Sequence, residues 1–353
     1  MPAVRLPTHV PNTVMRAETA LLRATMGLPE PVQRRLAGRP VVVDGQTLAT
    51  DLQLMLRLQR LAREAGAEEL PLDRGRRSIV RHATVSGGRQ PIGAVRDLQA
   101  GGRPARLYTP TRPTSGPLLL FLHGGGFMYG DLESHDAACR FLAEQSDVRV
   151  LAVDYRLSPE HRFPAAYDDA QAAFRWALDH ASDLEADPER IAVGGDSAGG
   201  NLAAGVAIEA ARSGLPCPWQ LLIYPFVDAR AETESRRLFG AGFYLTSDFI
   251  DLSDATYPEP GMDLRDPRLS PLHADLPAGV APAYVATAGF DPLRDEGETF
   301  AAKLRTAGVD VELRRFEDQI HGFLNIVGVG RSSRAANLEI AHTIRAQLVP
   351  QVP

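Results

Sequence analysis

Cysteine and long apolar runs are scarce in this sequence of 353 residues. Its two cysteines, Cys139 and Cys217, are too few for a disulfide framework or a thiolate metal site. We therefore predict no metal site and expect both cysteines to be small buried hydrophobic residues. No run of about 18 apolar residues occurs, and residues 1–14 lack the apolar core of a signal peptide. These absences predict a soluble, cytoplasmic protein.

An excess of basic residues is also lacking. The chain has 38 basic and 44 acidic residues, for a formal net charge of −6. Proteins that bind nucleic acids or anionic membranes are usually basic, so we expect neither a nucleic acid nor a membrane as partner. Hydrophobic residues make up 44% and charged residues 23%, which is typical of a globular protein and too apolar for a disordered one.

The first 85 residues contain helical patterns and almost no strand signal. Helices are predicted at residues 16–26 and 51–65, and in the second one Leu54, Leu58 and Leu61 share one face. An amphipathic helix can also lie on a membrane or in a partner's groove. Because arginines here mix with acidic residues, packing of this stripe against the protein's own body is favoured.

From about residue 80 onward, short apolar runs alternate with helical segments. The predicted strands are residues 106–108, 118–122, 148–153, 191–194, 220–224, 283–287 and 309–314, and the predicted helices are residues 136–145, 165–181, 199–213 and 297–307. The apolar runs are continuous, as in strands that are buried on both faces. The alternation predicts an α/β fold with a mostly parallel central sheet flanked by helices.

Residues 226–267 do not fit this alternation. They mix charged and aromatic residues without a strand or helix pattern, and a structureless connection of this length is uncommon in a compact domain. We therefore expect an insertion that folds above the sheet and forms a helical cap together with residues 1–85. Residues 86–353 would form the main α/β domain.

The strongest local motif is Gly195-Asp196-Ser197-Ala198-Gly199, which follows an apolar run and precedes a helical segment. Gly-x-Ser-x-Gly at a strand-to-helix junction is typical of a nucleophile elbow, although the pattern also occurs by chance in plain turns. Side chains two residues on either side of the serine would collide with neighbouring backbone. The helix that begins there points its first amides, starting with Ala198, at the reaction centre.

A second motif, His123-Gly124-Gly125-Gly126-Phe127, directly follows the predicted strand at residues 118–122. Consecutive glycines allow backbone N–H groups to approach a ligand and, with the amide after the nucleophile, to form an oxyanion hole. A phosphate-binding loop is the alternative, but neither Gly-x-Gly-x-x-Gly nor Gly-Lys-Ser/Thr is present. His123 is expected to be structural.

A serine nucleophile needs a base and a group that orients the base. Asp291 follows the predicted strand at residues 283–287, and His321 follows the predicted strand at residues 309–314. Because parallel strands place their sites at their carboxyl ends, both are expected on the same edge as Ser197. Asp295 and Glu296 are expected to begin the next helix instead. The remaining histidines fall in or beside other elements: His9, His82, His135, His161, His180, His273 and His342.

Taken together, the sequence resembles the bacterial hormone-sensitive-lipase-like branch of the α/β-hydrolases. The resemblance rests on five blocks in the family's order: His123-Gly124-Gly125-Gly126-Phe127, Asp154-Tyr155-Arg156-Leu157-Ser158-Pro159-Glu160, Gly195-Asp196-Ser197-Ala198-Gly199-Gly200-Asn201, Asp291-Pro292-Leu293-Arg294-Asp295-Glu296 and His321-Gly322-Phe323. They span about 200 residues of the printed sequence. Residues 1–85 carry no comparable motif.

The resemblance implies an α/β-hydrolase fold with a helical cap and the activity of a carboxylesterase on short- to medium-chain acyl esters. It implies Ser197 as nucleophile, His321 as base and Asp291 as the residue that orients the base. It also implies that the oxyanion-hole amides are those of Gly124, Gly125 and Ala198. Members of the family need no cofactor and are often dimers. For this chain, the helical segment at residues 335–349 and the strand that starts at Ala283 are candidate contacts of a homodimer.

Substrate preference is a weaker inference from the sequence. Four aromatic residues near the expected mouth or cap are candidates for an acyl-binding site: Phe127, Phe243, Tyr244 and Phe323. The alternative is that they belong to the core. The triad does not separate an esterase from an amidase, lactonase, epoxide hydrolase or deacetylase, because the pocket selects the leaving group. A receptor that binds a small molecule without hydrolysing it is disfavoured, because the base is present.

Overall fold

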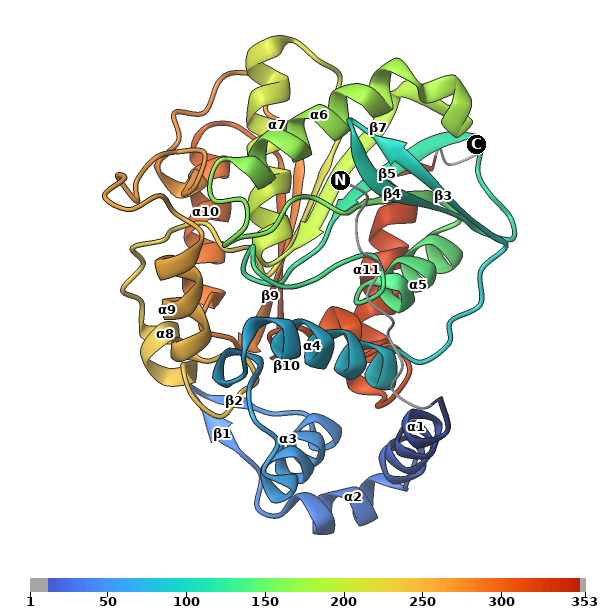
Figure 1. Cartoon of the computed structure of the whole chain (residues 1–353), viewed down its shortest axis with the longest axis vertical. Helices are drawn as coiled ribbons and strands as arrows, with labels where there is room; N and C mark the ends of the chain where they lie inside the picture. The colour runs from blue at the N-terminus through green and yellow to red at the C-terminus, as the bar shows by residue number, and fades with distance from the viewer. Residues whose placement is uncertain (1–11, 350–353) are drawn as a thin grey trace.

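An eight-stranded sheet runs through the middle of the chain in the computed structural model, which describes residues 12–349 (Figure 1). Its strands are β3 (Ala94–Ala100), β4 (Arg103–Thr109), β5 (Gly116–Leu122), β6 (Arg149–Val153), β7 (Ala186–Asp196), β8 (Gln220–Ile223), β9 (Ala283–Phe290) and β10 (Val311–Ile320). The spatial order is β10-β9-β8-β7-β5-β6-β4-β3. Strand β4 runs antiparallel to both of its neighbours, β3 and β6, and all other pairs of neighbouring strands in this sheet are parallel. The predicted mostly parallel sheet is therefore confirmed.

Helices cover both faces of this sheet. They are α5 (Asp136–Ser146), α6 (Ala165–Asp179), α7 (Ala198–Ser213), α10 (Arg294–Thr306) and α11 (Ser332–Leu348), with short 3₁₀ turns η2 (Ala181–Leu184) and η4 (Phe323–Asn325). In β5, Leu118, Leu120 and Leu122 pack with α6, α7 and α10. Leu119 and Phe121 pack on the other face with α5 and α11. Each such buried side chain stabilises the fold by about 1.5–3 kcal/mol, and burial on both faces explains the continuous apolar runs.

Two predictions about strands need correction. Strand β3 has no counterpart among the predicted strands. It lies at the edge of the sheet and exposes charged residues such as Arg96 and Asp97, so it lacks an apolar run. The strand that starts at Ala283 is not available for a dimer contact, because β9 pairs with β8 and β10 and all of its residues are buried.

The N-terminal segment, in blue in Figure 1, lies at one end of the molecule. It consists of α1 (Asn12–Met26), α2 (Glu30–Ala37), β1 (Val42–Val43), β2 (Gln46–Thr47), α3 (Thr50–Ala62), η1 (Ala67–Glu69) and α4 (Leu72–Gly87). The stripe predicted on α3 is only partly correct. Leu54 is buried and Leu58 is half-buried, but Leu61 is 70% exposed because it lies in the last turn. Helix α4 runs through the boundary predicted at residue 85. Residues 1–11, with His9 and most of the segment assessed for a signal peptide, lie outside the described residues.

Residues 226–267 contain two helices, α8 (Glu234–Phe239) and α9 (Ser247–Thr256), and are followed by η3 (Pro271–His273). Figure 1 shows α8 and α9 along one side of the molecule, next to the N-terminal segment at its end. The hydroxyl of Thr246 joins the two segments by donating to Glu68 Oε1 at 2.6 Å. Among residues 12–349, no helix has the length and apolar character needed to cross a membrane.

Both cysteines are free and behave as small hydrophobic residues. Cys139 is buried on α5 and Cys217 is partly buried before β8. Burial raises the pKa of the Cys217 thiol to about 12, so the reactive thiolate is disfavoured.

Candidate active site

Ser197 lies on a tight turn between β7 and α7. Its backbone has φ +55° and ψ −118°, a conformation that is costly for any residue other than glycine. The flanking glycines leave room for this turn. A Cβ atom at Gly199 would lie 1.9 Å from the carbonyl oxygen of Leu122, and one at Gly195 would lie 2.3 Å from the carbonyl oxygen of Gly199. The turn predicted from Gly-x-Ser-x-Gly is therefore present.

Ser197, His321 and Asp291 meet at the carboxyl edge of the sheet. Nε2 of His321 is 3.1 Å from Ser197 Oγ, and Nδ1 of His321 is 2.8 Å from Asp291 Oδ2. Each residue follows a different strand, respectively β7, β10 and β9. Residues more than 120 positions apart in the chain are thus aligned for proton transfer from a hydroxyl to an imidazole.

The surroundings of this triad fix its orientation. Asp291 is fully buried, and its Oδ1 accepts a hydrogen bond from the Leu293 amide at 2.8 Å. The ring of Tyr224 packs against the His321 ring with centroids 4.4 Å apart. One carboxylate oxygen is thereby held by backbone and the other is left for Nδ1 of His321.

The glycine loop after β5 differs in one respect from the prediction. The Gly124 amide donates to Asp196 Oδ1 at 2.8 Å, so its hydrogen points at a carboxylate and not at the cavity. The amides of Gly125 and Ala198 have no acceptor among residues 12–349 and remain available to a ligand. His123 is structural, as expected, because its Nδ1 lies 2.8 Å from the Gly124 carbonyl oxygen.

Two covering helices hold this loop in place. On α9, the Ser253 hydroxyl donates to the Gly126 carbonyl oxygen at 2.9 Å. The ring of Phe249 lies so close that a Cβ atom on Gly126 would be 2.8 Å from it. On α4, Arg76 Nε donates to the Met128 carbonyl oxygen at 2.9 Å. The loop is therefore fastened to the segments that cover it.

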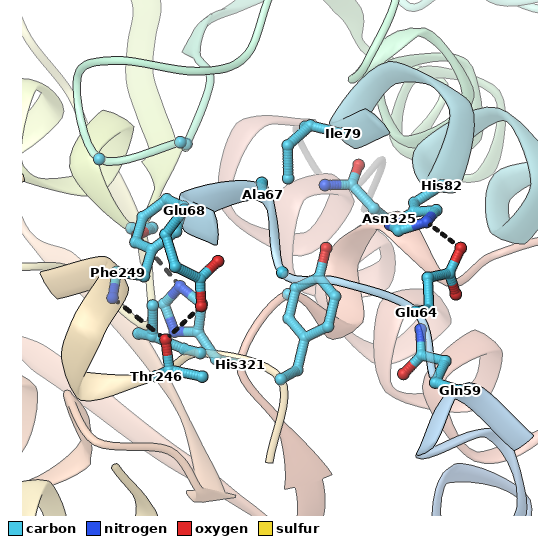
Figure 2. A pocket seen from close by; sticks show the side chains of 18 of the residues that line it. Gln59, Glu64, Ala67, Glu68, Ile79, His82, Thr246, Phe249, His321 and Asn325 are labelled. Carbon is cyan, nitrogen blue, oxygen red and sulfur yellow. Dashed lines mark hydrogen bonds and ion pairs between the residues drawn. The ribbon is translucent and has the colours of Figure 1, made fainter. Parts of the chain in front are cut away.

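A cavity of about 300 Å³ opens above Ser197. Its wall combines the N-terminal segment, the glycine loop and the insertion, with residues that include Leu56, Gln59, Glu64, Ala67, Glu68, Ile79, His82, Gly125, Tyr244, Leu245, Thr246, Phe249 and Asn325. Figure 2 shows the Glu68 and Thr246 side chains pointing toward each other beside His321, and the Glu64 and His82 pair farther from it. Apolar and polar side chains thus share the wall.

Of the four aromatic residues predicted for substrate binding, Tyr244 alone lines this cavity. Phe127 is buried and stacks on Tyr257, with ring centroids 3.9 Å apart. Phe323 is fully buried against Tyr224. These two residues belong to the core, because loop geometry turns their rings inward.

Phe243 lines an adjacent smaller cavity of about 190 Å³ between α3 and the insertion. Its ring also packs against Phe239 and Phe290, with centroids 5.5 and 5.3 Å away. Phe243 therefore lies next to the main cavity and not in its wall.

The polar residues of the cavity wall were not predicted. Nε2 of His82 lies 2.7 Å from Glu64 Oε1, and this hydrogen bond outweighs partial burial and lowers the pKa of Glu64. Glu68 and Thr246 form the bond that joins the N-terminal segment to the insertion. None of these residues lies in a motif, and they meet only in the folded chain.

Known proteins were compared with this chain in sequence and in structure. Residues 119–325 match the family that is described by the alpha/beta hydrolase fold. Carboxylic ester hydrolase LipN of Mycobacterium tuberculosis is 47% identical over 338 residues, which cover 91% of this chain and 89% of that protein. Ethyl acetate hydrolase of Pseudomonas putida is 37% identical and is matched over 93% of its length and 79% of this chain.

Solved structures are similar over most of the chain. A hyperthermophilic esterase from the archaeon Pyrobaculum calidifontis has a TM-score of 0.80 at 38% identity, covering 86% of this chain and 99% of that one. An ester hydrolase from the metagenome of Lake Arreo, solved with a bipyridine phosphonate derivative, also has a TM-score of 0.80 at 37% identity and covers 85% of this chain and 98% of that one. The predicted α/β-hydrolase fold is confirmed.

Proposed function

Since the chain belongs to the hormone-sensitive-lipase-like branch of the α/β-hydrolase family, we propose that it is a serine carboxylesterase in which Ser197 is the nucleophile, His321 the base and Asp291 the residue that orients the base. One observation carries these roles: Nε2 of His321 is 3.1 Å from Ser197 Oγ while its Nδ1 is 2.8 Å from Asp291. The named relatives are ester hydrolases. They favour ester hydrolysis over the hydrolysis of amides, lactones or epoxides and over a receptor role.

Catalysis proceeds in two steps. The Ser197 oxygen attacks the ester carbonyl carbon while its proton passes to Nε2 of His321, and Asp291 stabilises the resulting imidazolium. The tetrahedral intermediate then expels the alcohol, which takes the proton from His321 and leaves an acyl group on Ser197. Water attacks this acyl-enzyme with His321 again as base, the acid is released and the Ser197 hydroxyl is restored. No cofactor takes part in this sequence.

The negative charge of the tetrahedral intermediate needs hydrogen-bond donors. The amides of Gly125 and Ala198 fill this role, which is supported by their lack of a protein acceptor among the described residues. Gly124 acts indirectly, since its amide is bonded to Asp196. Loss of one oxyanion donor typically costs roughly 3–4 kcal/mol of transition-state stabilisation.

Residues 1–85 and 226–267 act as a helical cap that limits the size of the substrate. Support comes from the wall of the cavity, to which both segments contribute and whose volume is about 300 Å³. Carboxylates from Glu64 and Glu68 in this wall disfavour a long fatty chain. The substrates are therefore soluble esters with short to medium acyl chains, which Tyr244 helps to bind.

Replacement of the nucleophile tests this proposal. Ser197→Ala should reduce hydrolysis of p-nitrophenyl butyrate by roughly 10⁵- to 10⁶-fold, because the attacking oxygen is lost. Ser213→Ala, at the far end of the same helix, is the matched control and should keep wild-type activity. An organophosphonate should label Ser197 in the wild type and in the control variant. Undiminished turnover by Ser197→Ala would remove the proposed mechanism.

The acyl-chain preference is tested separately with p-nitrophenyl acetate, butyrate and palmitate. The two shorter esters should give the higher kcat/KM, because the cavity cannot enclose a palmitoyl chain. Faster hydrolysis of emulsified long-chain triglyceride than of the butyrate would reverse the proposed preference.

We also propose that the protein is cytoplasmic and forms a homodimer. Helix α11 and the edge strand β10 are the candidate contacts, since β9 lies inside the sheet. Light scattering after gel filtration measures the oligomeric state, and cell fractionation measures the location. A monomer, or recovery of the protein with membranes, would contradict these two assignments.

A further inference from the structure

A buried histidine and aspartate lie directly behind the glycine loop. Nε2 of His135 is 3.2 Å from Asp196 Oδ1, and each of the two side chains is 5% exposed. Neither belongs to the triad. Asp196 precedes the nucleophile Ser197, and His135 precedes α5. Burial of a charged group is costly unless hydrogen bonds or an opposite charge compensate for it, so this pair needs a physical explanation.

Asp196 is ionised and packs closely against the glycine loop. Burial alone would raise the pKa of this carboxyl, but the charge of His135 and hydrogen bonds from His135 and Gly124 outweigh burial and lower that pKa. Oδ1 accepts from the Gly124 amide at 2.8 Å, and Oδ2 accepts from the Tyr224 hydroxyl at 3.4 Å. A Cβ atom on Gly124 would lie 2.5 Å from Oδ2, so only glycine allows the carboxylate to approach this closely.

The neighbours of His135 orient its ring. The Ser134 hydroxyl, which is bonded to the Asp131 carbonyl oxygen at 2.9 Å, lies 3.0 Å from Nδ1 of His135. Nε2 faces the Asp196 carboxylate, which can only accept, so Nε2 carries a hydrogen. Nδ2 of Asn325 lies 3.3 Å from the same nitrogen. The Nε2–H group of His135 therefore donates to Asp196.

The other groups around this ring leave its bond to Asp196 in place. Burial, together with the neighbouring His135, lowers the pKa of His123 to about 4, so His123 is neutral. The His123 ring centroid lies 5.5 Å from that of His135, and His123 stacks on Tyr155. The Asp136 carboxylate is bonded to Arg106 and Arg140 instead. Asp196 is therefore the carboxylate that His135 contacts.

We propose that His135 is a positioning residue for ester hydrolysis: its Nε2–H group holds the Asp196 carboxylate on the Gly124 amide, and this bond fixes the loop so that the Gly125 amide faces the oxyanion. The inference rests on the proposed esterase function. His135 acts through Asp196 and Gly124 and does not itself touch the reacting atoms. Its effect should therefore fall on kcat, because substrate binding precedes formation of the oxyanion.

Three variants test the proposal with p-nitrophenyl butyrate as substrate. His135→Leu removes the donor to Asp196 and should lower kcat by about 10- to 100-fold, less than or equal to the loss of a whole oxyanion donor, with KM changed less than twofold. His135→Gln keeps an N–H that can reach Asp196 and should recover most of kcat. Asp196→Asn keeps an oxygen for Gly124 but removes the charge, and should lower kcat less than His135→Leu does.

A stability control distinguishes the proposed positioning role of His135 from a purely structural one. Ile340→Ala removes a buried side chain from α11, which carries none of the loop or triad residues, and should lower the melting temperature with kcat unchanged. If His135→Leu lowered the melting temperature similarly and kept kcat within twofold, the proposal would be wrong. Equal losses of kcat in His135→Leu and His135→Gln would also overturn it. Should His135→Leu fail to fold, full kcat in Asp196→Asn would overturn it.

Failure of the esterase proposal gives a different result. Ser197→Ala sets the background of the assay, and wild-type turnover no higher than this background would contradict the proposed function itself. With wild-type turnover well above it, only the ratios among the His135 and Asp196 variants decide the role of His135.

Discussion

Two backbone oxygen atoms limit the space for a side chain at position 199, in the turn that carries Ser197. A Cβ atom at position 199 would lie 1.9 Å from the Leu122 carbonyl oxygen and 2.6 Å from that of His123. Both obstacles are backbone atoms at the end of β5, so they cannot move aside as a flexible side chain can. Ser197 depends on this close approach, since its strained turn packs the start of α7 against the end of β5.

Gly199→Ala should therefore destabilise the protein by roughly 1–3 kcal/mol or more and strongly reduce esterase activity. The matched control is Gly297→Ala on α10, where a Cβ atom would meet only side-chain atoms, the Thr287 methyl group at 3.3 Å and Cδ of Pro225 at 3.5 Å. This control should fold with wild-type activity and gain up to about 1 kcal/mol of helix propensity. Thermal unfolding and butyrate hydrolysis measure both effects. Equal behaviour of the two variants would contradict the steric explanation.

At the residue scale, the sequence predicted what depends on local geometry. Ser197, Asp291 and His321 each follow a predicted strand, and the carboxyl ends of parallel strands lie at the same edge of a sheet irrespective of the loops. The Gly124 amide was assigned wrongly, because its direction depends on the Asp196 carboxylate, which lies 72 positions away along the chain. Such a partner leaves no periodic signal.

At the scale of elements, one threonine side chain forms a hydrogen bond between the start of α9 and the N-terminal segment. Thr246 Oγ1 accepts from the Phe249 amide at 3.1 Å, which caps α9, and donates to Glu68 at 2.6 Å. The same helix carries Ser253, which bonds to the Gly126 carbonyl oxygen. Loosening the start of α9 therefore affects the wall of the cavity and the glycine loop together.

Thr246→Val loses both hydrogen bonds and should lower the free energy of unfolding by about 1–2 kcal/mol, as removal of a helix cap does. The melting temperature should fall by a few degrees, roughly 2–4 °C per kcal/mol. Thr246→Ser retains the hydroxyl and serves as the matched control, with stability near that of the wild type. A Val variant as stable as the Ser variant would show that this hydroxyl does not hold α9.

Element prediction was best where burial is two-sided. Strands β5 to β9 were recognised from apolar runs, whereas the exposed edge strand β3 was missed and only the first residues of the other edge strand, β10, were predicted. Helix α4 was also missed, because its sequence is rich in arginine and only Gly75, Ala83 and Gly87 are buried. The aromatic residues Phe127 and Phe323 were misplaced, since hydrophobicity does not tell a core ring from a cavity ring.

At the scale of the whole molecule, the cavity could not have been predicted. Its wall joins residues 56–82, 124–126, 242–249 and 321–325, and no two of these segments adjoin in the sequence. Tertiary packing brings these segments together, and no sequence pattern indicates that they meet. The sheet edge, by contrast, follows from strand direction alone, so the reacting groups were predicted and most of their surroundings were not.

The stability of the whole molecule should depend on pH through Asp254 on α9. Burial raises the pKa of this carboxyl to about 7, and the negative charges of Glu296, Asp251 and Asp228 add to the effect while Arg236 opposes it. An unfolded aspartate has a pKa of about 3.9. Between about pH 4 and pH 7 the folded chain binds a proton that the unfolded chain has released. The free energy of unfolding therefore decreases as pH rises through this window, by up to about 1.4 kcal/mol per pH unit.

Asp254→Asn carries no charge at any pH, so it should be more stable than the wild type at pH 8 and differ less at pH 5. Asp248→Asn removes an exposed carboxylate from the same helix that is not among the charges acting on Asp254, so it is the matched control and should follow the wild-type pH dependence. Urea unfolding at both pH values gives the free energies. If Asp254→Asn and the wild type differed by the same amount at pH 5 and pH 8, protonation of Asp254 would not be linked to folding.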